Sequence, residues 1–201
     1  PTSTPTTPPT NTPTFTPAPP TSTPTPAPGN TGLKSPAANA PVTSGSGDNN
    51  GFETNPGNAY TSNNAYAVDN NSGTNTSSSP TDAGKDRHLF YNFSLGVPSG
   101  AAILGIEVQL EAKVDNTTGS PKMYAQLSWD GGATWTTAKG TATLKKRDAL
   151  YTLGSTSDLW GRTWTDGELS NASFRVRLID VATNTSRDFS LDHVAVRVTY
   201  Q

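Results

Sequence analysis

Hydrophobic and polar positions alternate with a period of two along much of the chain, which is the pattern of half-buried β-strands. The longest run covers residues 106–114, with an apolar face made of Ile106, Val108, Leu110, Ala112 and Val114. A second run, residues 89–95, would place Leu89, Tyr91, Phe93 and Leu95 on one face. A third covers residues 174–178. No window shows helical periodicity over three turns, so the pattern predicts strands.

The last run, residues 189–200, changes phase part-way. Phe189 and Leu191 share one parity, whereas Val194 and the alternate residues up to Tyr200 share the other. A β-bulge inserts one extra residue into a strand, so a bulge near Asp192–His193 would return all of these side chains to the core face.

Turn-forming residues separate the runs, at 97–100, 116–119 and 130–132. Several short strands with turns between them predict an all-β domain over residues 48–201, an antiparallel β-sandwich of jelly-roll type. The pattern disfavours a parallel sheet, because its strands would be continuously apolar and joined by helices.

Residues 1–28 differ from this domain in composition. They hold eleven prolines and eleven threonines, no charged residue and one large apolar side chain, Phe15. Proline fixes φ and removes a backbone donor, so this Thr/Pro-rich tail favours extended polyproline II and suits O-glycosylation. Residues 29–47 are small and polar and are interpreted as a linker.

Composition and charge exclude several classes of protein. A net charge of −2 does not supply the basic field that a nucleic-acid binder needs. The absence of cysteine rules out disulfides, thiolate metal sites and a thiol nucleophile. No apolar run approaches the ~20 residues that a membrane-spanning helix requires, so we expect no membrane insertion.

The segment from Ser128 to Trp135 has the spacing S-x-D-x-G-x-T-W and resembles the Asp-box, a β-hairpin motif of sialidases and other secreted β-proteins. Asp130 can accept backbone N–H groups of its own turn, and Trp135 can lie beneath the hairpin. The motif is structural where it occurs, and we expect a structural hairpin here.

Four tryptophans are candidates for carbohydrate binding: Trp129, Trp135, Trp160 and Trp164. Trp160 and Trp164 lie four residues apart and would form an aromatic platform for sugar rings. The alternative, which we favour, is that these rings close the open end of the sandwich, where large aromatic side chains supply much of the buried area.

The sequence contains no recognisable active site, and we expect no catalytic residue, no metal-ligand motif and no cofactor. His88 and His193 lack an HExxH spacing or a GxSxG elbow. Glu107 and Glu111 share one strand face, where cross-strand pairing with Arg175 and Arg177 is a simpler account than a pair of catalytic carboxylates. Calcium remains open as a minor alternative, with oxygen ligands from the acidic loop residues Asp48, Glu53, Asp69, Asp82 and Asp86.

Six segments resemble, in the same order, a module of bacterial extracellular and cell-surface proteins that often adjoins Thr/Pro-rich linkers. They are GFETNPGNAY (51–60), VPSGAAILGIEVQLEAKVD (97–115), QLSWDGGATW (126–135), YTLGSTSDLWGRTW (151–164), LSNASFRVRL (169–178) and LDHVAVRVTY (191–200). The resemblance implies a non-catalytic β-sandwich outside the cell or on its surface.

Two functions are compatible with these observations. The first is a structural subunit of a bacterial surface filament or stalk, a homopolymer in which the tail of one copy contacts the next and Phe15 docks in a neighbour. The second is a carbohydrate-binding or adhesion module carried on a glycosylated Thr/Pro linker. Both share a fold and a compartment, so the sequence separates them poorly.

Overall fold

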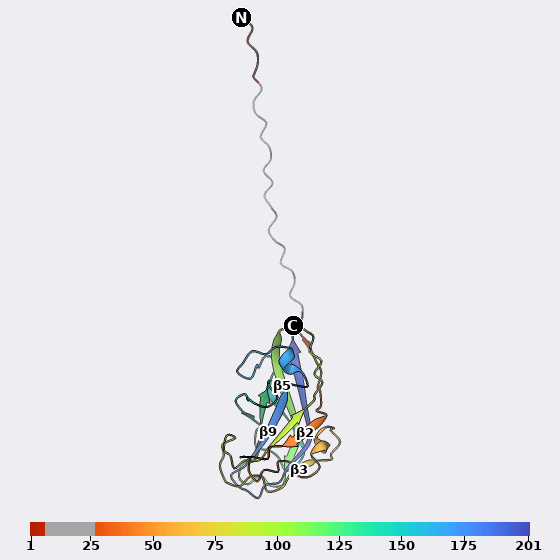
Figure 1. Cartoon of the computed structure of the whole chain (residues 1–201), viewed down its shortest axis with the longest axis vertical. Helices are drawn as coiled ribbons and strands as arrows, with labels where there is room; N and C mark the ends of the chain where they lie inside the picture. Colours follow the sequence, from red (N-terminus) through yellow and green to blue (C-terminus); the bar gives the residue numbers. More distant parts are fainter. Residues whose placement is uncertain (7–26) are drawn as a thin grey trace.

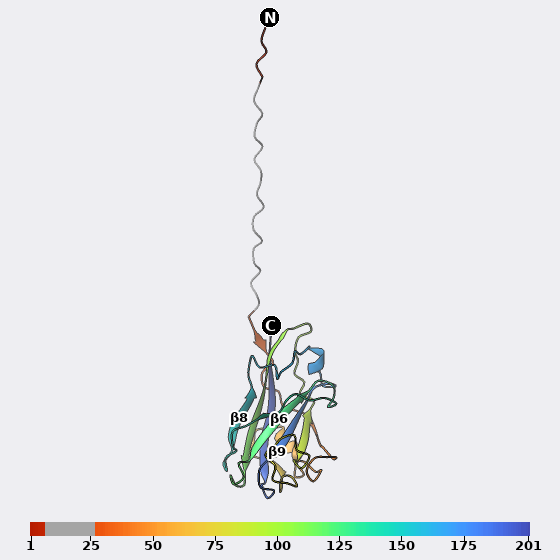
Figure 2. The same cartoon turned by 90° about the vertical axis from the view of Figure 1, so that its left-hand side faces the viewer.

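The structure is a computed structural model, which describes residues 1–6 and 27–201. The domain is a β-sandwich of two antiparallel five-stranded sheets, as the alternating pattern predicts (Figures 1 and 2). Sheet A has the order β1-β10-β5-β8, with β3 also paired to β10, and sheet B has the order β2-β4-β9-β6-β7. The bounds of sheet A are β1 Gly29–Asn30, β3 Ala67–Asp69, β5 Ile103–Val114, β8 Ala149–Gly154 and β10 Phe189–Tyr200. Those of sheet B are β2 Ala38–Pro41, β4 Arg87–Tyr91, β6 Lys122–Ser128, β7 Lys139–Gly140 and β9 Arg175–Val181.

Helical structure in the described residues is limited to two 3₁₀ turns, η1 Pro56–Ala59 and η2 Gly167–Leu169. Within the same residues, no helix has the length and apolar character needed to cross a membrane.

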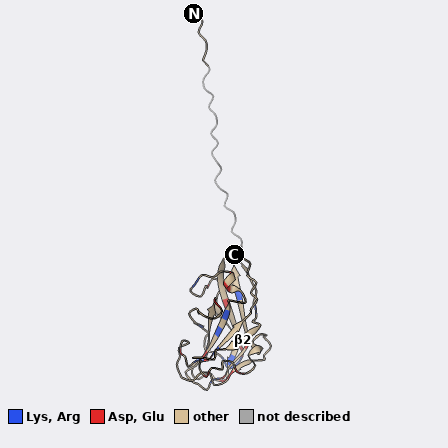
Figure 3. Ribbon diagram, viewed as in Figure 1, with Lys and Arg blue, Asp and Glu red and all other residues tan. Residues whose placement is uncertain are grey.

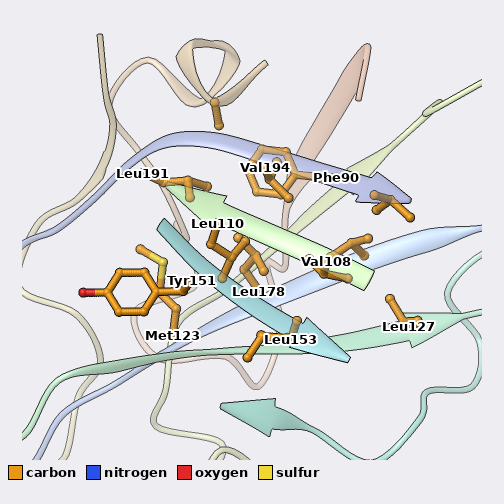
Figure 4. Packing of buried hydrophobic residues seen from close by; sticks show 14 of the residues in the cluster. Phe90, Val108, Leu110, Met123, Leu127, Tyr151, Leu153, Leu178, Leu191 and Val194 are labelled. Atoms are coloured by element: carbon orange, nitrogen blue, oxygen red, sulfur yellow. The ribbon is translucent and has the colours of Figure 1, made fainter. Parts of the chain in front are cut away.

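The core lies between the two sheets and is made of their inward-facing apolar side chains. Figure 4 shows Val108 and Leu110 of β5 and Leu191 of β10 close to Phe90 and Leu178 of sheet B. All five side chains are at most 1% exposed. This burial is the main stabilising term of such a fold, because each large apolar side chain removed from water contributes about 1.5–3 kcal/mol.

β5 and β10 form the central pair of sheet A, and their register confirms the predicted bulge. Leu191 pairs with Ala112 and His193 pairs with Glu111, so Asp192 is the extra residue on β10. After the bulge, Val194, Val196 and Val198 all return to the core, where each is fully buried.

The prediction for residues 89–95 was wrong in face and in length. β4 ends at Tyr91, and its inward residue is Phe90, which is fully buried, whereas Leu89 and Tyr91 point outward and are only partly buried. The cause is backbone conformation. Asn92 and Ser94 adopt positive φ of 62° and 49°, which breaks the alternation before the chain buries Phe93 and Leu95.

Residues 29–47 were predicted to be a linker, but the structure corrects this boundary. Gly29–Asn30 pair with Tyr200 and Thr199 at one edge of sheet A, and Ala38–Pro41 pair with β4 at one edge of sheet B. Strand pairing uses backbone groups alone, so a segment of small residues can add to a sheet edge without a hydrophobic pattern of its own.

Candidate functional site

Two of the four tryptophans are core residues. Trp160 is 3% exposed and Trp164 is 6% exposed. The indole N–H of Trp160 donates to the carbonyl of Ile106 at 2.9 Å, and that of Trp164 donates to the carbonyl of Leu159 at 2.9 Å. Rings that are buried and fully hydrogen-bonded offer no open face to a sugar, so the predicted platform of these two side chains does not fit the structure.

A tight turn places Trp160 at the end of the sandwich. The Asp158 carboxylate accepts the backbone N–H of Trp160 at 2.8 Å and forms an ion pair with Lys139 at 2.8 Å. Trp160 itself adopts φ of 56°, a conformation that large residues rarely use. The turn therefore swings this ring inward over β5, and the four-residue spacing to Trp164 does not describe a surface array.

The other two tryptophans belong to the hairpin after β6 and are partly exposed. Asp130 accepts the backbone N–H of Thr134 at 2.9 Å, and Ser128 accepts that of Gly132 at 2.8 Å, which are the turn contacts expected of the spacing. The Thr134 hydroxyl, which also donates to Asp130, and the Thr134 backbone N–H lower the pKa of Asp130 to about 2. The hairpin thus holds Trp129 and Trp135 on a well-defined turn.

Each of these two rings has an arginine against it. The Arg162 guanidinium carbon lies 4.0 Å from the Trp129 ring centre, and that of Arg177 lies 4.1 Å from the Trp135 ring centre. Trp129 also meets Trp164 edge-on at 6.2 Å. Cation–π contacts of this kind fix ring orientation, so both indoles are preorganised.

The hairpin and the Trp160 turn together border an open hollow of about 360 Å³, which we call the tryptophan hollow. It is lined by Trp129, Trp135, Thr136, Thr137, Trp160, Gly161 and Arg162. Three of the four tryptophans proposed from the sequence therefore meet at one place, and Trp164 lies behind them. The sequence did not identify Thr136, Thr137 or Arg162, which only the fold brings to the hollow.

Charge in the tryptophan hollow is balanced. Arg162 forms an ion pair with Glu168 at 2.7 Å, and hydrogen bonding to Arg162 lowers the pKa of Glu168. The guanidinium is thereby neutralised while its flat face stays against Trp129. Aromatic rings, the exposed Thr137 hydroxyl and a neutralised arginine can stack on and hydrogen-bond a polar, uncharged ligand.

Basic residues follow β9 on the outer surface of sheet B, where they are visible as blue positions in Figure 3. Arg175 stacks on Tyr91, with its guanidinium carbon 4.6 Å from the ring centre, and Arg177 hydrogen-bonds Gln126 at 2.6 Å. Burial and then the charge of Arg87 lower the pKa of Arg177 to about 10. Gln126, Arg87 and Arg177 also line a second hollow of about 310 Å³.

Two of the acidic loop residues considered as calcium ligands, Asp69 and Asp86, are buried. Asp69 at the end of β3 is fully buried, and Asp86 before β4 is 1% exposed. The carboxyl group of Asp69 lies within hydrogen-bonding reach of that of Asp180 on β9, but neither can donate while both are ionised. Burial, followed by the charge of Asp180, raises the pKa of Asp69 well above its ordinary value. Burial also raises the pKa of Asp180, and that of Asp86 to about 6.

Both histidine rings make hydrogen bonds to neighbouring parts of the fold. The His88 ring accepts the backbone N–H of Phe52 at 3.1 Å and contacts the Asn39 side chain at 2.9 Å. Burial lowers the pKa of His88 to about 4, so the ring is neutral. His193 contacts the Ser35 hydroxyl at 2.8 Å. The predicted pairing of Glu107 and Glu111 with Arg175 and Arg177 was wrong, because β9 lies in the other sheet from β5. Glu107 instead forms an ion pair with Arg197 of the neighbouring β10 at 2.7 Å. Phe15, the residue predicted to dock in a neighbour, lies outside the described residues.

A comparison with protein families finds no match for this chain, and a comparison with curated proteins finds none either. Among solved structures, the chain is similar to the structure of CBM35 from Cellvibrio japonicus Abf62, with 9% identity, a TM-score of 0.38, and coverage of 83% of this chain and 90% of that one. It is also similar to the CBM22-1–GH10 modules of Clostridium thermocellum endo-1,4-β-D-xylanase 10B complexed with xylohexaose. Here the identity is 8% and the TM-score 0.30, with coverage of 68% of this chain and 24% of that one. These are distant likenesses, and the functional argument stands on the site itself.

Proposed function

We propose that this domain is a non-catalytic carbohydrate-binding module that holds a neutral glycan in the tryptophan hollow. The observation that carries the proposal is that the two partly exposed rings, Trp129 and Trp135, line one space beside polar groups, with the buried Trp160 beneath it. Its volume of about 360 Å³ lies within the range of about 300–1,000 Å³ that is usual for small-ligand sites.

The chemistry of the lining matches a sugar ring. A pyranose has an apolar C–H face that packs on an indole, and a rim of hydroxyls that need donors and acceptors. Trp135 offers an indole held in place by Arg177, while Thr136 and Thr137 lie beside it in the lining. The ion pair between Arg162 and Glu168 removes the net charge that would favour an anion.

We infer binding without hydrolysis because the lining of the tryptophan hollow contains no acidic residue. Cleavage of a glycosidic bond ordinarily requires two carboxyl groups flanking that bond, about 5–9.5 Å apart. None of the residues that line the tryptophan hollow is acidic. The Thr/Pro-rich residues 1–28 would then be the spacer of an extracellular or cell-surface protein.

Replacing Trp135 with alanine tests the site. We expect Trp135→Ala to weaken glycan binding by at least about tenfold, because aromatic anchors supply most of the affinity of such sites. A glycan array identifies the ligand with the wild-type chain, and isothermal titration calorimetry then compares the variants.

Tyr124→Ala is the matched control. Tyr124 is another partly exposed aromatic on sheet B, but it lines a separate hollow of about 240 Å³. Its loss should leave glycan affinity unchanged. The proposal is rejected if the wild type binds no glycan on the array, or if Trp135→Ala binds as tightly as the wild type.

The filament interpretation depends on residues 1–28, most of which lie outside the described residues, and it stays a prediction. It requires that the full chain form regular polymers visible by electron microscopy, and that deletion of residues 1–28 abolish them. A narrower form of the idea requires that Phe15→Ala impair assembly. A full chain that remains monomeric would contradict both.

A further inference from the structure

Three carboxylates converge at the outer surface of sheet A, away from the residues that line the tryptophan hollow. Glu111 on β5, Asp148 just before β8 and Asp192 on β10 each present an oxygen within 4.8 Å of the other two. None of these three residues is among the five acidic loop residues that the sequence suggested as calcium ligands.

Strand register explains why residues so distant in sequence meet. Glu111 lies on the middle strand, paired with His193 of β10 on one side and with Leu150 of β8 on the other. Asp192 is the extra residue of the bulge beside His193, and Asp148 comes two residues before Leu150. The bulge thus adds a carboxylate to a place where two others already lie.

This cluster contains polar atoms that the protein leaves without a partner. Asp192 is 1% exposed and its Oδ2 has no hydrogen-bond partner, and the buried Oδ1 of Asp148 has none either. In the described part of the chain, none of the three carboxylates forms an ion pair with lysine, arginine or histidine. Buried carboxylates are normally paired or coordinate a metal, because an isolated buried charge is costly.

One loop supports all three carboxylates. The Ser62 hydroxyl donates to Glu111 at 2.6 Å, the backbone N–H of Asn63 donates to Asp192 at 3.2 Å, and the Tyr66 hydroxyl donates to Asp148 at 3.3 Å. Such outer contacts orient the ligands of metal sites. They also leave Oδ1 of Asp148 and Oδ2 of Asp192 available.

We propose that Glu111, Asp148 and Asp192 form a calcium site. Oxygen-only ligands select a hard cation over zinc or copper. Calcium binds oxygens at about 2.3–2.6 Å, so two ligands of one ion lie no more than about 5 Å apart, which agrees with the 4.8 Å limit observed here. Magnesium demands a stricter octahedral geometry than three residues from three separate elements are suited to provide.

Bound calcium would fasten three parts of sheet A to one another. It would join the middle of β5, the start of β8 and the bulge of β10, and through Ser62, Asn63 and Tyr66 it would fix the loop above them. The ion would therefore stabilise the folded domain without contacting the tryptophan hollow.

The test uses the full chain, stripped with EGTA and titrated with calcium chloride while the thermal midpoint is followed. We expect the midpoint to rise and to saturate, because a ligand that binds only the folded state stabilises it. Terbium should bind in place of calcium and luminesce through Tyr66, whose hydroxyl contacts a ligand carboxylate. Added calcium should then quench that signal.

Two variants assign the site. Glu111→Gln changes a partly exposed residue and should fold normally, and Asp192→Asn changes the buried ligand. Each should weaken calcium binding by more than about tenfold. Asp166→Asn is the control, because this carboxylate accepts the backbone N–H of Gly100 on another loop. The inference is overturned if calcium leaves the wild-type midpoint unchanged, or if Glu111→Gln and Asp192→Asn respond to calcium as the wild type does.

Discussion

Asp180→Asn is expected to stabilise the protein at neutral pH, and its advantage over the wild type should grow as the pH rises from about 4. The reason is the pair of carboxyl groups between the sheets. Asp69 is fully buried and Asp180 is 2% exposed, and neither oxygen of Asp69 has a hydrogen-bond donor. An amide at position 180 would supply that donor and remove one of the two buried charges.

The direction of the pH effect follows from the raised pKa values. Burial and the charge of Asp180 raise the pKa of Asp69 well above its ordinary value, so the folded chain keeps a proton that the unfolded chain releases near pH 4. The stabilising effect of that proton is fully present below the unfolded pKa and is lost as the pH rises through the folded pKa. The loss is up to about 1.4 kcal/mol per pH unit for each proton.

Comparison with the variant is necessary because His88 acts in the opposite sense. Its pKa is lowered to about 4, so its contribution to stability is lost as the pH falls. That contribution is common to both proteins and cancels in the difference. Urea unfolding at a series of pH values, with EGTA present, measures that difference. A difference that stays constant or shrinks as the pH rises would contradict the prediction, and Asp166→Asn serves again as the control.

The strand pattern carried most of the information about the fold. The period of two identified β5, and the change of phase in residues 189–200 located the bulge at Asp192. It failed at β4, because Asn92 and Ser94 take positive φ and shift the parity of Phe93 and Leu95. It also failed for residues 29–47, which join the sheets through backbone pairing and so leave no trace in hydropathy.

The candidate sites were less predictable, because they depend on contacts between distant segments. Glu111, Asp148 and Asp192 are brought together by strand register, which the sequence does not specify. Asp180 has the same parity as Val176 and Leu178 and is buried with them, but it lies beyond the predicted run of residues 174–178. The parity of that strand does not predict that Asp180 lies against Asp69, which is followed by polar residues in the sequence.

The sequence also does not tell which tryptophan rings are structural and which contact a ligand. Substitution of Trp160 and of Trp135 should distinguish the two roles by their effects on stability. Trp160→Ala is expected to lower the free energy of unfolding by about 3–5 kcal/mol, the usual cost of removing a large aromatic ring from a core. It would also leave the Ile106 carbonyl without the indole donor that it has at 2.9 Å. Because small domains have only about 5–15 kcal/mol of stability, this loss approaches complete unfolding.

Trp135→Ala provides the comparison, because this ring is partly exposed and the hairpin beneath it is held by Ser128 and Asp130. Its cost in urea unfolding should be on the order of 1 kcal/mol, while glycan affinity falls. Trp160→Phe should lie between the two, since it restores apolar bulk but not the donor to Ile106. If Trp160→Ala left stability unchanged, or Trp135→Ala unfolded the domain, the division between a buried structural ring and a ligand-facing ring would be wrong.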